Sequence, residues 1–248
     1  MTTRASAGFV NARDIGGLLL EGGGHTRRGV LYRSEIPLHG DPLPEFDPWP
    51  PATVCDLRSA EEQRGGHPLD TPATTMLVTP LLADRDPTRL AAESHGLNLI
   101  EIYAEIFAAC GDSMVRIAEA VATSRGPTLI HCAGGKDRTG VAIAILLAAV
   151  GVCRTEIVRD FLITAQRLRG IHDRLVAAEP PANREAFRER LRDNDPWASV
   201  DSPTAAIAGV LDGLESHDGG AGGWLMRRGL VPAHIAALRA RLVDEPSG

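Results

Sequence analysis

A ten-residue stretch at 131–140, His-Cys-Ala-Gly-Gly-Lys-Asp-Arg-Thr-Gly, separates two apolar segments of different kinds. Pro127–Ile130 is short and has the composition of a buried strand, whereas Val141–Val150 is long enough for a buried helix and is followed by Gly151. We therefore predict a strand, a tight loop with adjacent glycines, and a helix. Such a loop directs successive backbone N–H groups toward one point at a helix N-terminus, where an anion binds.

The residues of this loop have the chemistry of a nucleophile and a phosphate clamp. Cys132 begins the loop, and its reactive form is the thiolate, which nearby N–H dipoles and a helix N-terminus stabilise. Arg138 ends the loop with a planar, permanently charged group that binds phosphate through two hydrogen bonds. His131 can fix the loop through its ring nitrogens. The residues expected to bind the phosphate are Ala133, Gly134, Gly135, Lys136 and Thr139.

This pattern resembles the phosphate-binding loop of cysteine-dependent protein tyrosine phosphatases, in which the cysteine and arginine have the same spacing and a threonine follows. The longer form, Gly-Lys-Asp-Arg-Thr-Gly, is similar to one bacterial branch, the tyrosine and phosphoinositide phosphatases of mycobacteria and Listeria. That branch usually has alanine where this chain has Gly134, so we expect a slightly looser loop. The resemblance implies hydrolysis of phosphate monoesters through a cysteinyl-phosphate, without a metal or another cofactor. The implied substrates are phosphotyrosine proteins, with phosphoserine, phosphothreonine and phosphoinositides as further candidates.

Four aspartates are candidates for the acid that protonates the leaving oxygen. Asp56 follows a predicted strand, and the resembling enzymes have the same Asp-Leu-Arg-Ser segment there. Asp137 lies inside the loop, and the resemblance implies a role for it in turnover. Asp84 and Asp86 lie in the segment where many tyrosine phosphatases carry a mobile loop that contains the acid. The alternative for Asp56 is an ion pair with Arg58 that only holds the loop, and the sequence does not choose between these readings.

Lys136 is the only lysine among the 26 lysine and arginine residues. A compact ammonium group inside an anion loop can reach a second phosphate of a substrate, or pair with Asp137.

Tyr103 is predicted on a helix at core spacing and could also line the pocket. Arg13 and Asp14 are predicted to be structural residues beside the loop.

The predicted fold is a single α/β domain over residues 9–248, after a flexible tail at 1–8. A tyrosine-phosphatase-like, mostly parallel sheet is flanked by helices, and the site lies at the C-terminal ends of the strands. Further strands are predicted at Gly29–Ser34, Thr53–Cys55 and Val78–Leu82. Helices are predicted within Leu97–Thr123, from Arg154, at Ser202–Leu214 and at Pro232–Leu242, with a hinge at Gly219–Trp224.

Residues 166–194 are rich in arginine and glutamate and poor in large apolar residues. Gly170 and the pair Pro180–Pro181 predict at least two breaks in this helical stretch. A segment with so weak a core is either a solvated helical hairpin or, as the resemblance implies, a helical lid over the site that moves.

Composition limits the partners. The net charge of −6 argues against nucleic acid and anionic membranes as general partners. The longest apolar run, about Val141–Cys153, is shorter than the roughly 20 residues that span a bilayer, so we expect no stable membrane insertion. Four scattered cysteines and no recognisable signal peptide predict a cytoplasmic protein, with export by a route independent of a signal peptide as the alternative.

Two other functions use a similar loop. A phosphate-ester-binding pseudophosphatase would bind without turnover, although binding alone does not need the thiol of Cys132. A rhodanese-like sulfurtransferase also carries a loop cysteine, but Arg138 and Thr139 at the loop's end fit phosphate better. A P-loop nucleotide site is excluded, since that motif needs serine or threonine after the lysine and Asp137 stands there.

Overall fold

The computed structural model describes residues 8–63, 66–82, 98–193 and 202–245. Its strands are β1 (Arg13–Asp14), β2 (His25–Thr26), β3 (Leu31–Ser34), β4 (Thr53–Asp56), β5 (Thr75–Val78), β6 (Thr128–His131) and β7 (Val243–Asp244). Its helices are η1 (Ala60–Glu62), α2 (Leu99–Ala109), α3 (Gly111–Thr123), α4 (Asp137–Ala149), α5 (Arg154–Gln166), α6 (Leu168–Ala178), η2 (Pro181–Asn183), α7 (Arg184–Asp193), α8 (Ser202–Glu215), α9 (Gly220–Arg227) and α10 (Pro232–Leu242).

Within the described residues, five strands form the main sheet in the order β1-β3-β6-β4-β5. The strands β3, β6, β4 and β5 are parallel, and only β1 runs antiparallel to its neighbour. A small second sheet joins β2 to β7. These observations confirm the predicted α/β fold with a mostly parallel sheet.

Alternate residues of the central strands face two different cores. Cys55 and Ile130 point into the large helical core, whereas Tyr32, Val54 and Leu129 form a second cluster on the opposite face. This alternation is what a strand's period of two dictates. The second face is covered by loop residues, among them Phe46, Trp49 and Leu69.

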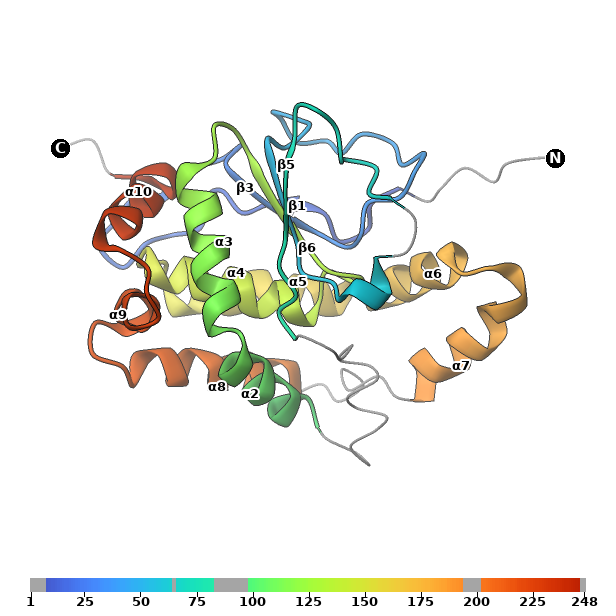
Figure 1. Ribbon diagram of the computed structural model, residues 1–248. Coiled ribbons are helices and arrows are strands. Elements are labelled where there is room, and N and C mark those ends of the chain that lie inside the picture. The colour runs from blue at the N-terminus through green and yellow to red at the C-terminus, as the bar shows by residue number, and fades with distance from the viewer. Residues whose placement is uncertain (1–7, 64–65, 83–97, 194–201, 246–248) are drawn as a thin grey trace.

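Helix α4 follows the loop at 132–136 and runs beneath the sheet, with α5 and α8 packed beside it (Figure 1). Its residues from Val141 to Leu147 are all buried, which explains why this segment is apolar all round. Helix α3 packs on β4 and on α10. The loop is thereby fixed between a central strand and a buried helix.

The prediction of a strand at Val78–Leu82 was wrong, because β5 ends at Val78. Its partner β4 ends at Asp56, the residue opposite Val78. Beyond that point single hydrogen bonds hold the segment, from the N–H of Thr79 to the carbonyl of Asp56 at 3.0 Å and from that of Leu81 to the carbonyl of Leu57 at 3.4 Å. Leu81 and Leu82 are nevertheless buried, as loop residues. The apolar character of the segment reflects this burial and not a strand.

The predicted hinge at Gly219–Trp224 is also wrong, since α9 begins at Gly220. Gly219 has a left-handed φ of 74° and sets the start of the helix. Trp224 is fully buried and its ring stacks on Phe107, with 5.2 Å between centroids. Tertiary packing of Trp224 therefore outweighs the low helix propensity of the glycines.

The segment predicted as a lid is helical and breaks before α6 and again at Pro180. Gly170 is not one of the breaks, since it lies inside α6. Helix α6 is anchored: Ile171 is fully buried, and the guanidinium of Arg174 donates to the carbonyl oxygens of Gly8 and Ile36. Helix α7 is exposed, with Leu191 its one buried residue among those described. Movement of 166–194 stays a prediction.

The flexible tail predicted at 1–8 lies outside the described residues, apart from Gly8. Among the described helices, none combines the length and the apolar composition that crossing a bilayer requires.

Candidate active site

The loop's carbonyl groups are held from outside by donors. The carbonyl of Ala133 accepts from the N–H of Ile36 at 2.9 Å. The carbonyl of Gly135 accepts from Asn11 Nδ2 at 3.0 Å and from Arg33 Nη2 at 2.9 Å. In a trans peptide the N–H of the next residue points away from the carbonyl. The N–H groups that follow these carbonyls are therefore directed toward the inside of the loop, as an anion site requires.

Gly135 is the position at which the loop could accept no other residue. Its φ is +64°, and an added Cβ would lie 2.4 Å from the carbonyl oxygen of Ser34 at the end of β3. Close approach of two backbone segments thus fixes the curvature of the loop.

Cys132 is the first residue after β6 and only 3 % of its surface is exposed. Its carbonyl oxygen lies 3.2 Å from Nδ1 of His131, the last residue of the strand. The hydroxyl of Thr139 is buried and hydrogen bonds to none of the described residues. A buried hydroxyl without a partner is available to a group bound in the loop, which fits the predicted role of Thr139 in binding.

Arg138 is buried in the first turn of α4 and pairs with a residue that we did not predict. Its Nη1 and Nη2 lie 2.6 and 2.7 Å from the two carboxylate oxygens of Glu62. Burial alone would raise the pKa of Glu62, but the hydrogen bonds and the charge of Arg138 outweigh it and the pKa is lowered. The same carboxylate accepts from the N–H of Ser59 at 2.8 Å. The Ser-x-x-Glu capping pattern at 59–62 was the one sequence signal for Glu62.

Asp137 is mostly buried, and Oδ1 accepts a hydrogen bond of 3.1 Å from the hydroxyl of Tyr103. Tyr103 comes from α2 and is fully buried. Burial and the adjacent carboxylate raise the pKa of Tyr103 well above its usual value. Tyr103 is therefore a core residue whose hydroxyl also orients the carboxylate of Asp137.

Asp56 stands at the end of β4, and its carboxylate is occupied by Arg58. Arg58 Nη2 lies 2.7 Å from Oδ2, and Nε lies 2.9 Å from Oδ1. Burial would raise the pKa of Asp56, but His131 and the hydrogen bonds and charge of Arg58 lower it overall. A carboxylate held ionised in this way is poorly suited to donate a proton, so the geometry favours the ion-pair reading of Asp56.

A second buried carboxylate, Asp160 on α5, was not predicted. It lies 2.7 Å from Arg33 on β3 and 2.7 Å from Arg13 on β1. Burial would raise the pKa of Asp160, but Arg33 and Arg13 outweigh it and the pKa is lowered. Arg33 also binds the loop carbonyl of Gly135, so Asp160 supports the loop through it. Arg13 is thereby structural, as predicted.

Asp14 is structural too, because its carboxylate accepts from the N–H groups of Gly16 and Gly29 at 2.8 Å each.

Helix α6 lies against the loop at Gly134. An added Cβ there would be 3.3 Å from Ile171 Cγ2 and 3.8 Å from Leu175 Cδ1. It would also be 3.5 Å from Cγ of Lys136, so the stem of Lys136 runs along the same side. The glycine lets α6 sit close to the loop, and the space left by the missing methyl is filled by the helix.

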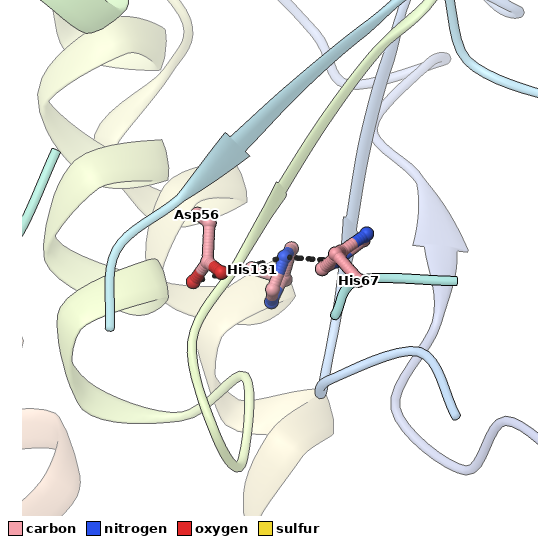
Figure 2. Close-up of side chains that lie close together, drawn as sticks. All are labelled: Asp56, His67 and His131. Carbon is pink, nitrogen blue, oxygen red and sulfur yellow. Dashed lines mark hydrogen bonds and ion pairs between the residues drawn. The ribbon is translucent and has the colours of Figure 1, made fainter. Parts of the chain in front are cut away.

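Three groups beside the loop, Asp56, His67 and His131, have potential ligand atoms within 4.8 Å of one another (Figure 2). They do not fit a metal. Both oxygens of Asp56 are bound by the guanidinium of Arg58. His67 Nδ1 accepts from the N–H of Leu69 at 3.1 Å, which leaves the ring proton on Nε2, the atom that a metal would need.

Asp84 and Asp86, the other predicted acids, lie outside the described residues. Of the predicted residues that are described, the structure gathers Cys132, Asp137, Arg138 and Thr139 at the N-terminus of α4, while Asp56 lies at the adjoining end of β4 and faces Arg58.

Comparison with known proteins agrees with this geometry. The model of a family described as the tyrosine phosphatase family matches residues 5–244. This chain belongs to the tyrosine phosphatase family. The predicted resemblance is therefore confirmed at the level of the family.

Individual relatives are more distant. A protein of Cupriavidus necator named as a tyrosine-protein phosphatase is 35 % identical over 173 residues, which are 63 % of this chain and 61 % of that protein. A tyrosine-protein phosphatase of Nostoc commune is 35 % identical over 118 residues, 47 % of this chain and 39 % of the relative. The triple specificity protein phosphatase PtpB of Mycobacterium tuberculosis is 49 % identical over 47 residues, 19 % of this chain and 17 % of the relative. Each alignment thus covers less than two thirds of the relative's own length.

Proposed function

We propose that this chain hydrolyses phosphate monoesters, phosphotyrosine first among them, through a cysteinyl-phosphate. The observation that carries the proposal is the loop at 132–136, whose carbonyls are bound from outside and whose N–H groups face inward beside Cys132 and Arg138. That arrangement supplies donors for three phosphate oxygens at the place where the nucleophile stands.

In the first step the sulfur of Cys132 attacks phosphorus, the S–P bond forms and the P–O bond to the leaving group breaks. Asp137 gives its proton to the departing oxygen. Arg138 and the inward N–H groups stabilise the charge on the transferring phosphoryl group. This assignment of the acid is supported by the position of Asp137 in the loop and by the pairing of Asp56 with Arg58.

In the second step water attacks phosphorus and the S–P bond breaks. Asp137, now ionised, takes a proton from the water, and inorganic phosphate leaves. Thr139 donates its hydroxyl to the departing thiolate, a role supported by the unused hydroxyl described above.

The test is turnover of p-nitrophenyl phosphate in EDTA by the parent, by Cys132→Ser and by Cys153→Ser. Cys153 is a partly exposed free cysteine at the start of α5 and serves as the matched control. We expect Cys132→Ser to lose activity completely and Cys153→Ser to keep it. Binding of phosphate esters without turnover in the parent would favour a pseudophosphatase, and sulfur transfer from thiosulfate to cyanide would favour a sulfurtransferase.

We further propose that Lys136 extends the substrate range to phosphoserine, phosphothreonine and phosphoinositides. It is the only lysine of the chain, and its side chain leaves the loop on the side that α6 covers. Lys136→Met should reduce turnover of a bisphosphorylated phosphoinositide more than turnover of a phosphotyrosine peptide. Equal losses on both substrates would contradict this role.

The location that we propose is a reducing compartment such as the cytoplasm, because the mechanism needs a free thiol at Cys132. Thiol labelling of the protein in intact cells before and after lysis, together with fractionation, tests this location.

A further inference from the structure

A chain of three hydrogen bonds links a surface turn to the backbone of the nucleophile. The N–H of Leu69 donates to His67 Nδ1 at 3.1 Å, and His67 Nε2 lies 3.0 Å from His131 Nε2. His131 Nδ1 in turn lies 3.2 Å from the carbonyl oxygen of Cys132. Figure 2 shows the two rings side by side, with their facing nitrogens joined.

The partners at the two ends determine where each proton is. A backbone N–H only donates, so Nδ1 of His67 carries a lone pair and its proton is on Nε2. A carbonyl oxygen only accepts, so Nδ1 of His131 carries the proton and Nε2 has the lone pair. His67 Nε2–H therefore donates to His131 Nε2, and every bond of the chain has one donor and one acceptor.

We propose that His67 is a positioning residue for the nucleophile: it selects the tautomer of His131 that holds the Cys132 carbonyl. Without this donor, Nε2 of His131 could carry the ring proton and share it with Asp56, whose Oδ1 lies 3.9 Å away. The Nδ1–H bond to Cys132 would then be lost. This consequence for catalysis rests on the proposed phosphatase function, whereas the tautomer does not.

The charges around the pair are compatible with two neutral rings. His131 faces Asp56, Arg58 and His67, and its burial lowers the pKa to about 4. His67 also faces Asp70 and His39, and burial lowers its pKa as well. A proton added to His131 Nε2 would oppose the proton of His67 Nε2, so both rings stay neutral at pH 7.

Two substitutions of His67 distinguish its hydrogen bond with Leu69 from its hydrogen bond with His131. His67→Asn places a carbonyl oxygen near the position of Nδ1 and keeps the bond to Leu69, but it has no donor to His131. His67→Gln places an amide N–H near the position of Nε2 and restores that donor. The two variants are compared by thermal unfolding, so that a general loss of structure is recognised.

The direct measurement is the tautomer of His131, from ¹⁵N and proton spectra of the imidazole rings at pH 7. We expect the Nδ1–H form in the parent and in His67→Gln, and a mixture or the Nε2–H form in His67→Asn. An Nε2–H form in the parent would overturn the proposal, and so would an unchanged tautomer in His67→Asn. The parent spectrum decides the point even where a variant fails to fold.

The kinetic measurement is kcat/KM with p-nitrophenyl phosphate against pH, together with the rate at which iodoacetamide alkylates Cys132. One lost hydrogen bond predicts a fall of about three- to tenfold in kcat/KM for His67→Asn. His67→Gln should stay within about twofold of the parent, because it keeps the donor. Equal effects of the two variants would show a merely structural role. An inactive parent with the expected tautomer would sink the proposed function and leave the tautomer selection standing.

Discussion

The guanidinium of Arg138 meets the carboxylate of Glu62 in a bidentate pair, with both N–O distances at or below 2.7 Å. Arg138 belongs to the helix that follows the loop, and Glu62 to the short helix that follows β4. The pair holds the guanidinium plane in place, so that in the proposed mechanism a phosphate would meet a group that is already oriented.

Glu62→Gln removes the charge that orients Arg138 and keeps the size of the side chain. We expect kcat/KM with p-nitrophenyl phosphate to fall about 10- to 100-fold, because misplacing one phosphate-binding group costs about that much. Glu61→Gln, at the exposed neighbour on the same helix, should leave activity unchanged. Activity of the two variants within a factor of two of each other would contradict a role for the Glu62–Arg138 pair.

Asp137→Asn removes the proposed acid. Turnover of phosphotyrosine, a substrate with a poor leaving group, should fall about 100-fold or more, within the range for general acid catalysis. Turnover of p-nitrophenyl phosphate should fall less, because nitrophenolate leaves without a proton. The measurement compares the fold loss of kcat/KM on a phosphotyrosine peptide with the fold loss on p-nitrophenyl phosphate.

Asp56→Asn provides the contrast, since it leaves Arg58 buried without its partner charge. We expect a loss of unfolding free energy of about 3–5 kcal/mol. The ratio of turnover between the two substrates should not change. A preferential loss on phosphotyrosine in this variant, and not in Asp137→Asn, would make Asp56 the acid.

Asp160→Asn breaks a buried pair on each side, since Arg13 and Arg33 both depend on the carboxylate. We expect about 3–5 kcal/mol less unfolding free energy in urea, because two buried cations lose their counter-charge. Asp212→Asn is the matched control, because Asp212 pairs with Arg154 at the surface and is 68 % exposed. Asp212→Asn should lower the free energy of unfolding by less than about 1 kcal/mol.

Gly134→Ala tests the contact between the loop and α6. The new methyl would lie 3.3 Å from Cγ2 of Ile171, a buried side chain that would have to move by a few tenths of an ångström, and we expect a loss of about 1–3 kcal/mol in stability. Gly222→Ala is the control, because its methyl meets nothing within 4 Å inside α9. It should stabilise the protein by about 0.5–1 kcal/mol. A neutral or stabilising Gly134→Ala would show that α6 does not rest on the loop.

The free energy of unfolding should decrease as the pH falls from about 6.5 to about 4, because His131 is buried as a neutral ring. Burial lowers the pKa of His131 in the folded state from 6.5 to about 4. Between these values the unfolded chain binds a proton that the folded chain does not, so stability rises with pH. The full contribution is about 3 kcal/mol.

Urea unfolding of the parent and of His131→Asn at pH 7 and pH 5 measures this slope. Burial raises the pKa of Glu35, and this makes the protein more stable as the pH falls. The contribution of Glu35 is present in both proteins, so it cancels when the pH dependence of one is subtracted from that of the other. Equal slopes for the two proteins would contradict a buried neutral His131.

Much of the fold could be predicted from local patterns. The apolar runs predicted β6 and the body of α4 from Val141, and the C-terminal helix has its predicted bounds, Pro232–Leu242. The errors arose where local signals and tertiary burial disagree. Leu81 and Leu82 are apolar because a loop is buried, and the glycines near Trp224 are helical because the tryptophan packs into the core.

Cys132, Asp137, Arg138 and Thr139 could be predicted to lie together from sequence, because they fall within eight consecutive residues of one strand–loop–helix unit. The distant groups that hold them could not be predicted in this way. Glu62 stands 76 residues from Arg138, and Tyr103 stands 34 residues from Asp137. No local pattern encodes such pairs, because they form only when separate strands and helices pack. The same packing joins His67 to His131, 64 residues away. The pair of Asp56 and Arg58 spans only two residues and was one of the two sequence-based alternatives, between which the observed contacts decide.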